Sequence, residues 1–368
     1  MSCESRWLAF GCLAWMVLMV GCAGMLPARK MALSEREQEM ANRLCLNEQQ
    51  LQRMKSKPLY QLTERELGAY LGYLQEMEHD VKLRVQHLGR KMMGQRYQIF
   101  LLGEFPFELY DPEPLYSLRK SDCLVFAEHM YAMALAHDWS SFIALLQRIR
   151  YKDGRIGMLT RNHYTEADWV VNNSWLVEDL TAELVGDRAV PVTSVIDRAR
   201  FFRRFGIGQD IPPQELSWSY IPYELLPEFI DRLQPGDFVN IVRGNQEGLY
   251  VGHVGLITRS EDGTVNLLHS THPRVVEEPL MELCREAPAM RTARERDNQR
   301  IAAKNRKIQA RNERVQRTGK GKAKPLLPLK PYFYGFRFYR LRMDALEELR
   351  RRDGPHAPRV EFVPNARP

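Results

Sequence analysis

Three residues in this sequence have types and surroundings that could support nucleophilic catalysis. Cys123 follows Ser121 and Asp122, both good capping residues, so we expect the thiol in the first turn of a helix. His253 stands in Gly-His-Val-Gly and His269 in Leu-Leu-His-Ser, each within an expected strand. A thiol attacks as its thiolate, and both a helix N-terminus and a neighbouring imidazole lower its pKa. The pattern therefore predicts a cysteine nucleophile with a histidine as its base.

The register of one hairpin decides whether the two histidines can cooperate. A two-residue turn between their strands would place His253 and His269 on opposite faces of the sheet, because side chains alternate along a strand. A three-residue loop with Gly263 in the left-handed conformation would instead pair Ser260 with Thr264. The two histidines would then be diagonal neighbours, roughly 7–8 Å apart at the backbone and within imidazole reach. We therefore predict the three-residue loop.

Each of these signals also has a purely structural explanation. A cysteine that opens an apolar helix is more often a buried core residue, and a histidine in a strand is usually structural. The order of Cys123, His253 and His269 along the chain favours catalysis over these alternatives. A disulfide between Cys45 and Cys284 would leave Cys123 as the unpaired thiol, although the sequence does not establish that bridge. No CxxC pair or HExxH motif is present, so we expect neither a metal site nor a cofactor.

The beginning of the chain resembles an export signal. Residues 7–21 are apolar or small, which is the length of a secretory h-region. The run ends Leu-Met-Val-Gly-Cys at Cys22 and resembles a bacterial lipobox, so we expect residues 1–22 to be a lipoprotein signal peptide with Cys22 lipidated. An uncleaved membrane anchor is the alternative, because the uncharged stretch is long enough to span a bilayer. Ala23 is not the Asp of an inner-membrane retention signal, so we expect a periplasmic lipoprotein of the cell envelope, anchored in the outer membrane.

Helical and strand patterns occupy different parts of the chain. Capping boxes at residues 34–37 and 63–66 predict helices within an N-terminal helical region at 23–95. We expect the domain that carries Cys123 at 96–345 and a C-terminal tail at 346–368. Strands are expected at residues 238–242, 249–258, 265–270 and 332–341. Helices followed by consecutive strands predict an α+β fold with an antiparallel sheet.

A basic segment at residues 287–325 interrupts this domain. It contains 13 Lys and Arg and 3 Asp and Glu, whereas the whole chain carries a net charge of +7, so the remainder is slightly acidic. We expect a mobile or helical surface insertion there. Attraction to anionic lipid headgroups or wall polymers is one interpretation, and a merely solvated insertion is the other. The segment has no aromatic residue for base stacking, so we expect no nucleic-acid partner.

Several short segments in the expected catalytic domain together resemble one protein family. These segments are Asp122-Cys123-Leu124-Val125-Phe126-Ala127-Glu128, Ile149-Arg150-Tyr151-Lys152-Asp153-Gly154, Arg161-Asn162-His163-Tyr164, Asp168-Trp169, Pro235-Gly236-Asp237 and the two histidine strands. They resemble the N-acetylmuramoyl-L-alanine amidase-like family within the NlpC-type (papain-like) cysteine peptidase superfamily, over roughly residues 97–341 without the basic segment. The resemblance implies a papain-like NlpC-type fold, with the catalytic cysteine at the N-terminus of a helix packed on the antiparallel sheet.

This resemblance also implies a reaction, namely hydrolysis of the amide between N-acetylmuramic acid and L-alanine in peptidoglycan fragments (muropeptides). Cys123 would attack, His253 would act as general base and then acid, and His269 would orient His253. The backbone N–H of Cys123 would contribute to an oxyanion hole. The residues implied to shape the substrate pocket are Asp122, Arg161, His163, Tyr164 and Trp169. The alternatives are a stem-peptide endopeptidase of the same superfamily and a non-catalytic wall-binding lipoprotein.

Overall fold

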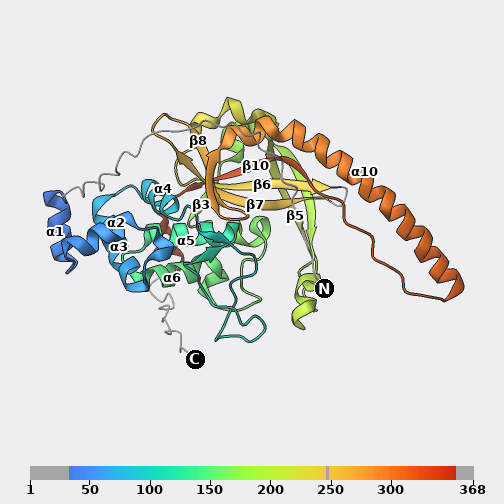
Figure 1. The fold of residues 1–368 in the computed structure, drawn as a ribbon, viewed down its shortest axis with the longest axis horizontal. Coiled ribbons are helices and arrows are strands. Elements are labelled where there is room, and N and C mark those ends of the chain that lie inside the picture. The colour runs from blue at the N-terminus through green and yellow to red at the C-terminus, as the bar shows by residue number, and fades with distance from the viewer. Residues whose placement is uncertain (1–32, 246–247, 354–368) are drawn as a thin grey trace, which may run out of the picture.

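The computed structural model describes residues 33–245 and 248–353 (Figure 1). The predicted signal peptide with its lipidation site Cys22, and the tail beyond residue 353, lie outside the described residues. Among the helices of the described part, none combines the length and apolar character needed to cross a membrane.

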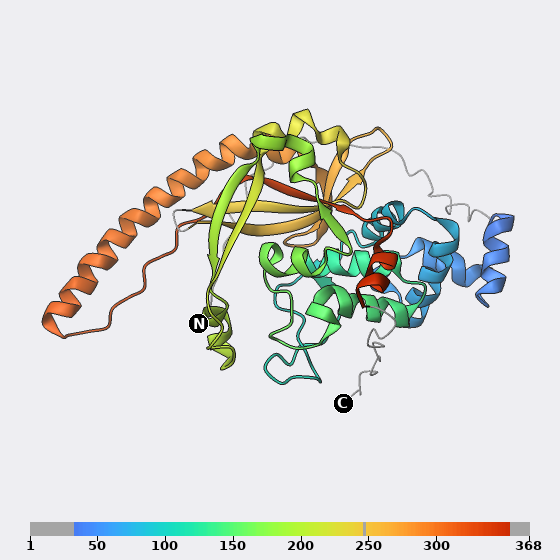
Figure 2. The ribbon, with the colours of Figure 1, turned by 180° about the vertical axis from the view of Figure 1, so that it is seen from behind.

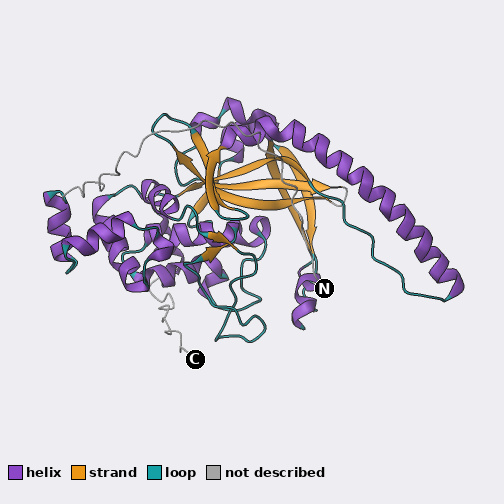
Figure 3. Ribbon diagram, viewed as in Figure 1, coloured by secondary structure: helices purple, strands orange, loops and turns teal. Residues whose placement is uncertain are grey.

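Helices precede most of the strands along the chain (Figure 3). The α-helices are α1 (Glu35–Arg43), α2 (Glu48–Ser56), α3 (Glu64–Met77), α4 (Val81–Lys91), α5 (Cys123–Leu135), α6 (Trp139–Arg150), α7 (Val170–Asn172), α8 (Thr181–Val185), α9 (Arg198–Phe202), α10 (Leu280–Thr318) and α11 (Ala345–Asp353). The strands are β1 (Arg96–Tyr97), β2 (Lys120–Ser121), β3 (Val177–Asp179), β4 (Val190–Ile196), β5 (Gln214–Pro222), β6 (Phe238–Asn245), β7 (Gly248–Arg259), β8 (Val265–Ser270), β9 (Val275–Pro279) and β10 (Tyr332–Leu341).

The N-terminal helices begin where the sequence predicts. The hydroxyl of Ser34 accepts a hydrogen bond from the Glu37 N–H while the Glu37 carboxylate accepts from the Ser34 N–H, and Thr63 and Glu66 repeat this pattern at the start of α3. Both predicted capping boxes are therefore confirmed. A C-terminal tail was expected from residue 346. Residues 346–353 instead belong to helix α11, whose Leu346 and Leu349 pack against the main core.

The main sheet has the strand order β4-β5-β10-β6-β7-β8-β9, with β3 pairing β10 at its end. All of these pairs are antiparallel. The strands predicted at 265–270 and 332–341 match β8 and β10, and the other two predicted strands lie within β6 and β7. Helices α3 to α6 pack together on one side of this sheet (Figures 1 and 2).

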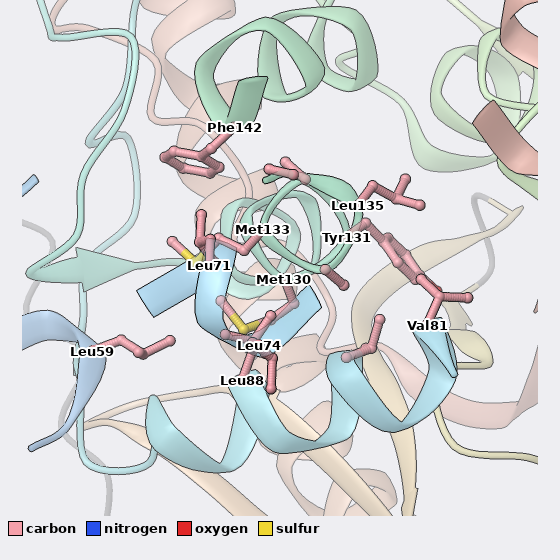
Figure 4. Packing of buried hydrophobic residues seen from close by; sticks show 14 of the residues in the cluster. Leu59, Leu71, Leu74, Val81, Leu88, Met130, Tyr131, Met133, Leu135 and Phe142 are labelled. Atoms are coloured by element: carbon pink, nitrogen blue, oxygen red, sulfur yellow. The ribbon is translucent and has the colours of Figure 1, made fainter. Parts of the chain in front are cut away.

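Alternating side chains of the central strands divide the core between the two faces of the sheet. Leu256 of β7 and Leu268 of β8 face α3 to α6 and join their hydrophobic cluster, which Figure 4 shows from close by. Their neighbours Ile257 and Leu267 face the opposite cluster, which α8 and the start of α10 cover. Period-two alternation of this kind is what a sheet buried on both faces requires.

Helix α5 is the buried centre of the first cluster. Every residue from Val125 to Leu135 is buried, because α3, α4, α6 and the sheet surround the helix (Figure 4). The Glu128 carboxylate inside it pairs with the Arg150 guanidinium at 3.3 Å, and both side chains are at least nine-tenths buried. A helix fixed on all sides holds its first turn, and so Cys123, in one position.

The loop between β7 and β8 has three residues, as predicted. The Ser260 N–H donates to the Thr264 carbonyl at 2.9 Å, the Gly263 N–H donates to the Ser260 carbonyl, and Gly263 has a φ of +85°. The paired residues of β7 and β8 run from Arg259 opposite Val265 to Leu256 opposite Leu268. Continuing this register by one residue places His269 beside Gly255. This register puts both histidines on one face of the sheet, and the prediction is confirmed.

Helix α10 and the chain that returns from it form a long projection that we call the arm, residues 280–331. Figures 1 and 2 both show α10 leading away from the rest of the molecule and the chain returning along it to β10. The basic segment therefore includes most of a 39-residue helix. The helix ends at Gly319, whose φ of +63° is the left-handed conformation typical of a helix C-terminus.

Candidate active site

Asp122 and Ser121 fix the start of α5. The Asp122 carboxylate accepts a hydrogen bond from the Val125 N–H at 2.9 Å, which makes Asp122 the N-cap and Cys123 the first helical residue. The Ser121 hydroxyl donates to Gln95 at 2.6 Å, and the Ser270 hydroxyl at the end of β8 donates to the Ser121 carbonyl at 2.9 Å. These bonds tie the nucleophile's helix to the strand that carries His269.

Two imidazoles and a carboxylate form a hydrogen-bonded chain on the sheet. Nε2 of His253 lies 2.6 Å from Nδ1 of His269, and Nε2 of His269 lies 2.9 Å from Oε1 of Glu278 on β9. The His253 ring is half-buried, His269 is 6% exposed, and the Glu278 side chain is mostly in water. The sequence analysis identified the two histidines but missed Glu278.

The carboxylate sets which nitrogen of each ring carries a proton. The hydrogen bond from His269 holds the pKa of Glu278 below its ordinary value, so Glu278 is a pure acceptor at neutral pH. A neutral His269 then donates from Nε2 and accepts at Nδ1, and His253 must donate from Nε2. The remaining nitrogen of His253, Nδ1, is left with the lone pair of a base.

Glycines allow the two histidine strands to approach. A Cβ atom on Gly255 would lie 2.6 Å from Cδ1 of Leu267 and 3.1 Å from Cβ of His269. A Cβ atom on Gly252 would lie 2.7 Å from Cδ of Arg243. Side chains of the neighbouring strands therefore occupy the space beside these glycines.

Cys123 is partly exposed and lies beside the histidine strand. The backbone N–H of Val254, the residue after His253, is directed at the Cys123 sulfur together with the N–H groups of Leu124 and Cys123 itself. The thiol forms no side-chain hydrogen bond with either imidazole within the described residues. The structure thus brings Cys123 to the strand that carries His253 and leaves the thiol–imidazole hydrogen bond unmade.

Electrostatics around the thiol differ from the sequence prediction. Burial raises the pKa of the Cys123 thiol to about 12, and the Asp122 carboxylate adds to this effect. The backbone N–H groups at the start of α5 lower the pKa, but by less. The predicted depression of the thiol pKa is therefore wrong for this structure, because desolvation and a neighbouring anion outweigh the helix terminus.

The base is neutral as well. Burial lowers the pKa of His253 well below 6.5, and the positive charges that His269 and Arg243 can carry act in the same direction. Burial lowers the pKa of the Arg243 guanidinium, on β6. A negative charge on Cys123 would raise that pKa, so the guanidinium lies within electrostatic reach of the sulfur. The Arg243 side chain forms no ion pair or hydrogen bond in the described part of the chain, and the sequence pattern did not indicate it. The resting pair is a thiol beside a neutral imidazole.

A pocket of about 590 Å³ opens beside the start of α5, and neither Cys123 nor His253 is among its lining residues. Asp122 and Leu124, which flank Cys123, line one side of it, and Arg161 and His163 line another. Its outer wall is aromatic and includes Phe100, Tyr110, Phe201 and Phe205. The Arg204 guanidinium lies over the rings of Phe201, Phe205 and Phe100, at 4.3, 4.7 and 5.7 Å from their centroids.

Two residues predicted to bind substrate line this pocket but are held by protein partners. The Arg161 guanidinium pairs with Asp111 at 3.1 Å and Glu104 at 3.3 Å, which fixes the loop before β2. Nε2 of His163 lies 2.7 Å from the Met158 carbonyl, and burial lowers the pKa of His163 to about 3. Both side chains therefore shape the pocket wall as rigid groups.

The other two predicted pocket residues lie elsewhere. Tyr164 stands outside the pocket lining, with Arg198 over its ring at 5.5 Å. Trp169 is completely buried, and its ring stacks on Phe238 at 4.5 Å and on Tyr131 at 6.3 Å. The predicted contact of Trp169 with substrate is therefore wrong, because its aromatic surface is already covered by the core.

The remaining cysteines take no part in this site. Cys45, Cys123 and Cys284 are all unpaired, so the Cys45–Cys284 bridge that we considered does not form in the structure. Among the described residues, no group of three or more His, Cys, Asp or Glu side chains could hold a metal ion.

The sequence of the chain matches a known protein family. A model of the N-acetylmuramoyl-L-alanine amidase-like (AmiA-like) family matches residues 87–290, which is more than half of the chain and includes Cys123, His253, His269 and Glu278. The match ends at residue 290, so most of the arm lies beyond it. A search of curated proteins gives no match.

One solved structure has a similar fold, and a second has a lower structural similarity. The crystal structure of a Legionella pneumophila protein has a TM-score of 0.58 at 18% identity and covers 74% of this chain and 92% of its own. That of an N-acetylmuramoyl-L-alanine amidase from Bacteroides uniformis has a TM-score of 0.45 at 20% identity and covers 71% of this chain and 99% of its own. By the family match over more than half of its length, the chain belongs to the N-acetylmuramoyl-L-alanine amidase-like family.

Proposed function

We propose that this protein is a peptidoglycan hydrolase that uses Cys123 to cleave the amide between N-acetylmuramic acid and L-alanine in muropeptides. The observation that carries the proposal is the hydrogen-bonded chain from Glu278 through His269 to His253, on the strand beside which Cys123 is held. Such a chain fixes the tautomer of a general base and stabilises the charge that it gains.

The reaction follows from these positions. His253 takes the thiol proton at Nδ1 as the Cys123 sulfur attacks the lactyl carbonyl carbon of the sugar. The carbonyl oxygen becomes an oxyanion, and the Cys123 N–H at the start of α5 donates to it. The C–N bond then breaks, His253 returns the proton to the departing L-alanine amine, and the sugar remains on Cys123 as a thioester. Water, deprotonated by His253, hydrolyses this thioester and releases the free acid.

The neutral resting pair suits this sequence of steps. Because Cys123 and His253 are both uncharged before attack, no ion pair needs to be desolvated in the groove. Charge appears only when the sulfur attacks, and Glu278 then stabilises the positive charge that forms on the two imidazoles.

The pocket beside Cys123 supports a sugar on one side of the bond. Exposed aromatic rings such as those of Phe100 and Tyr110 offer flat apolar surfaces, against which the C–H faces of a pyranose can stack. Polar side chains in the lining, including Asp122, can serve the sugar's hydroxyl and amide groups. This wall favours cleavage at the sugar over cleavage within the stem peptide.

Product analysis tests the reaction. Purified disaccharide-peptide muropeptides are incubated with the wild type and with Cys123→Ala, and the products are identified by mass spectrometry. We expect an intact stem peptide and a free sugar acid from the wild type only. A shortened stem peptide would identify an endopeptidase of the same superfamily. Equal products from both proteins would show that Cys123 is not the nucleophile, and no products from the wild type would support a non-catalytic wall-binding protein.

We further propose that the fold is a papain-like NlpC-type fold and that the protein is an outer-membrane lipoprotein facing the periplasm. The order of a cysteine-bearing helix followed by antiparallel histidine strands supports the first proposal. The lipobox-like sequence ending at Cys22 supports the second. Metabolic labelling with palmitate tests the anchor, since the label should appear on the wild type and be absent from Cys22→Ser.

A further inference from the structure

The arm is built from two interlocking repeats. Asn298, Asn305 and Asn312 are spaced seven residues apart on α10, and each forms a pair of hydrogen bonds with the returning chain. The paired residues there, Lys330, Leu327 and Lys324, are spaced three apart, and each donates its N–H to the asparagine Oδ1 and accepts from Nδ2 at its carbonyl. These six hydrogen bonds are 2.7 to 3.0 Å long.

The two repeats match in length. Seven residues of α-helix advance about 10.5 Å, and three residues of polyproline II chain advance about 9.3 Å. Each paired residue of the returning chain precedes a proline, at Pro325, Pro328 and Pro331, and a residue before proline is restricted to extended conformations. The stripe between the asparagines is aliphatic and half-buried, with Ile301 and Ile308. The arm is therefore a stiff rod and not a loose insertion.

The opposite face of this rod carries a row of positive charges. The row consists of Arg296, Arg300, Lys304, Lys307, Arg311 and Arg314, all exposed. Their separations of three and four residues keep them on one face of α10. Since neighbouring residues on a helix are about 100° apart, Lys307, two residues after Asn305, points away from the asparagine stripe.

The row is long, and most of its members have no ion-pair partner in the described part of the chain. Its first and last residues are 18 positions apart, or about 27 Å along the helix. Arg300 lies 3.8 Å from Asp297, and the other five side chains form no ion pair within the residues that the structure describes. Keeping unpaired like charges side by side is unfavourable, so a row fixed on a stiff rod indicates an anionic partner.

We propose that the arm docks this protein on an anionic phospholipid surface. A convex rod can touch a flat bilayer along the whole row, whereas a polymer chain is usually bound in a groove. Leu326 and Leu327 on the returning chain are exposed by 47% and 41% and add apolar contact area. The arm contains no aromatic residue on which nucleic-acid bases could stack. The proposed envelope location would bring the arm to such a surface, but the docking does not depend on the reaction.

Vesicle binding tests the docking with the full-length chain. Binding is measured by co-sedimentation with vesicles of phosphatidylcholine alone and with vesicles in which a third of the lipid is phosphatidylglycerol. An N-terminal lipid anchor would contribute equally to both, so the ratio of the two affinities isolates the contribution of charge. The arm variant carries Arg300→Gln, Lys307→Gln, Arg311→Gln and Arg314→Gln.

A matched variant controls for net charge. It also removes four positive charges, but from exposed residues outside the arm that form no ion pair with any described residue. These substitutions are Arg65→Gln, Arg119→Gln, Lys152→Gln and Arg350→Gln. Each basic residue at an anionic surface strengthens binding about fivefold. We therefore expect the arm variant to lose a few hundred-fold of the preference for anionic vesicles and the control to lose less than tenfold.

Three results would overturn the proposal. The wild type could show no preference for anionic vesicles, or the control variant could lose as much as the arm variant. Tighter binding to duplex DNA than to anionic vesicles at the same salt concentration would assign the row to nucleic acid instead. All three results are independent of whether the Cys123 reaction occurs.

Discussion

The protonation state of Cys123 gives a prediction that separates this site from one with a preformed thiolate–imidazolium pair. At pH 8, a thiol with a pKa of about 12 is ionised to about one part in ten thousand, whereas an ordinary thiol with a pKa of about 8.5 is ionised to about a quarter. A more basic thiolate is also more nucleophilic, which recovers roughly thirtyfold. We therefore expect Cys123 to react with iodoacetamide about 50- to 100-fold more slowly at pH 8 than the same residue in urea.

The assay follows each thiol separately by mass spectrometry of peptides after timed alkylation between pH 6 and 11. The rate at Cys123 should rise about tenfold per pH unit without a plateau, because the thiolate fraction limits it throughout. Cys45 is exposed and serves as the comparator within the same chain. His253→Ala should change the rate at Cys123 by less than about threefold, because the resting imidazole does not hold the thiol proton.

A plateau at or below pH 8 would refute this reasoning. It would mean that the thiolate forms at neutral pH and that a charged His253 stabilises it. The raised pKa also has a consequence for stability. The folded state holds the Cys123 proton more tightly than the unfolded state, so the stability is complete below the ordinary thiol pKa and falls as pH rises from there through about 12. Cys123→Ala should remove that part of the alkaline loss of stability.

Three substitutions probe the supports of the site and of the arm. Glu278→Gln keeps an acceptor for His269 but removes the charge. Because the Glu278 side chain is mostly exposed, we expect kcat/KM at pH 7 to fall only about fivefold, which is roughly 1 kcal/mol. Muropeptide turnover measures this change. Gly255→Ala should push His269 from its place and lower kcat at least tenfold, with a loss of about 1–3 kcal/mol in urea unfolding; full activity would show that the strand yields. Asn305→Leu should abolish the hydrogen-exchange protection of the Leu327 amide and change the free energy of unfolding by less than about 0.5 kcal/mol. Unchanged protection would show that Asn305 does not hold the returning chain.

The parts of the site that could be predicted are those fixed by local rules. The capping residue Asp122 precedes an apolar run, so the position of Cys123 at a helix start could be predicted from the sequence. The pairing of His253 with His269 followed from strand alternation and the length of one loop. Rules of this kind need only neighbouring residues, and the structure follows them closely.

The parts that could not be predicted depend on tertiary packing. Glu278 stands on β9, a strand that the sequence pattern did not indicate, and no spacing rule connects it with His269. The pKa of Cys123 depends on how deeply the sheet buries the start of α5. Trp169 sits in a polar stretch typical of a binding loop, yet its ring is in the core.

The arm contained a signal that could have been found. The seven-residue spacing from Asn298 to Asn312 and the three-residue spacing of the prolines from Pro325 to Pro331 are both visible in the sequence. Either repeat alone is unremarkable in a charged segment. Their relationship becomes apparent only when the chain is seen to fold back on the helix.

The acyl-enzyme intermediate offers the most direct test of the proposed reaction, because its mass identifies both the nucleophile and the bond. The wild type is mixed with a muropeptide, quenched in acid within milliseconds to seconds, digested with a protease and analysed by mass spectrometry. The proposed amidase predicts a thioester on the Cys123 peptide with the mass of the N-acetylmuramoyl sugar, and no adduct in Cys123→Ala. A peptide adduct on Cys123 would contradict the proposed bond, and turnover with no adduct on any cysteine would contradict the cysteine mechanism.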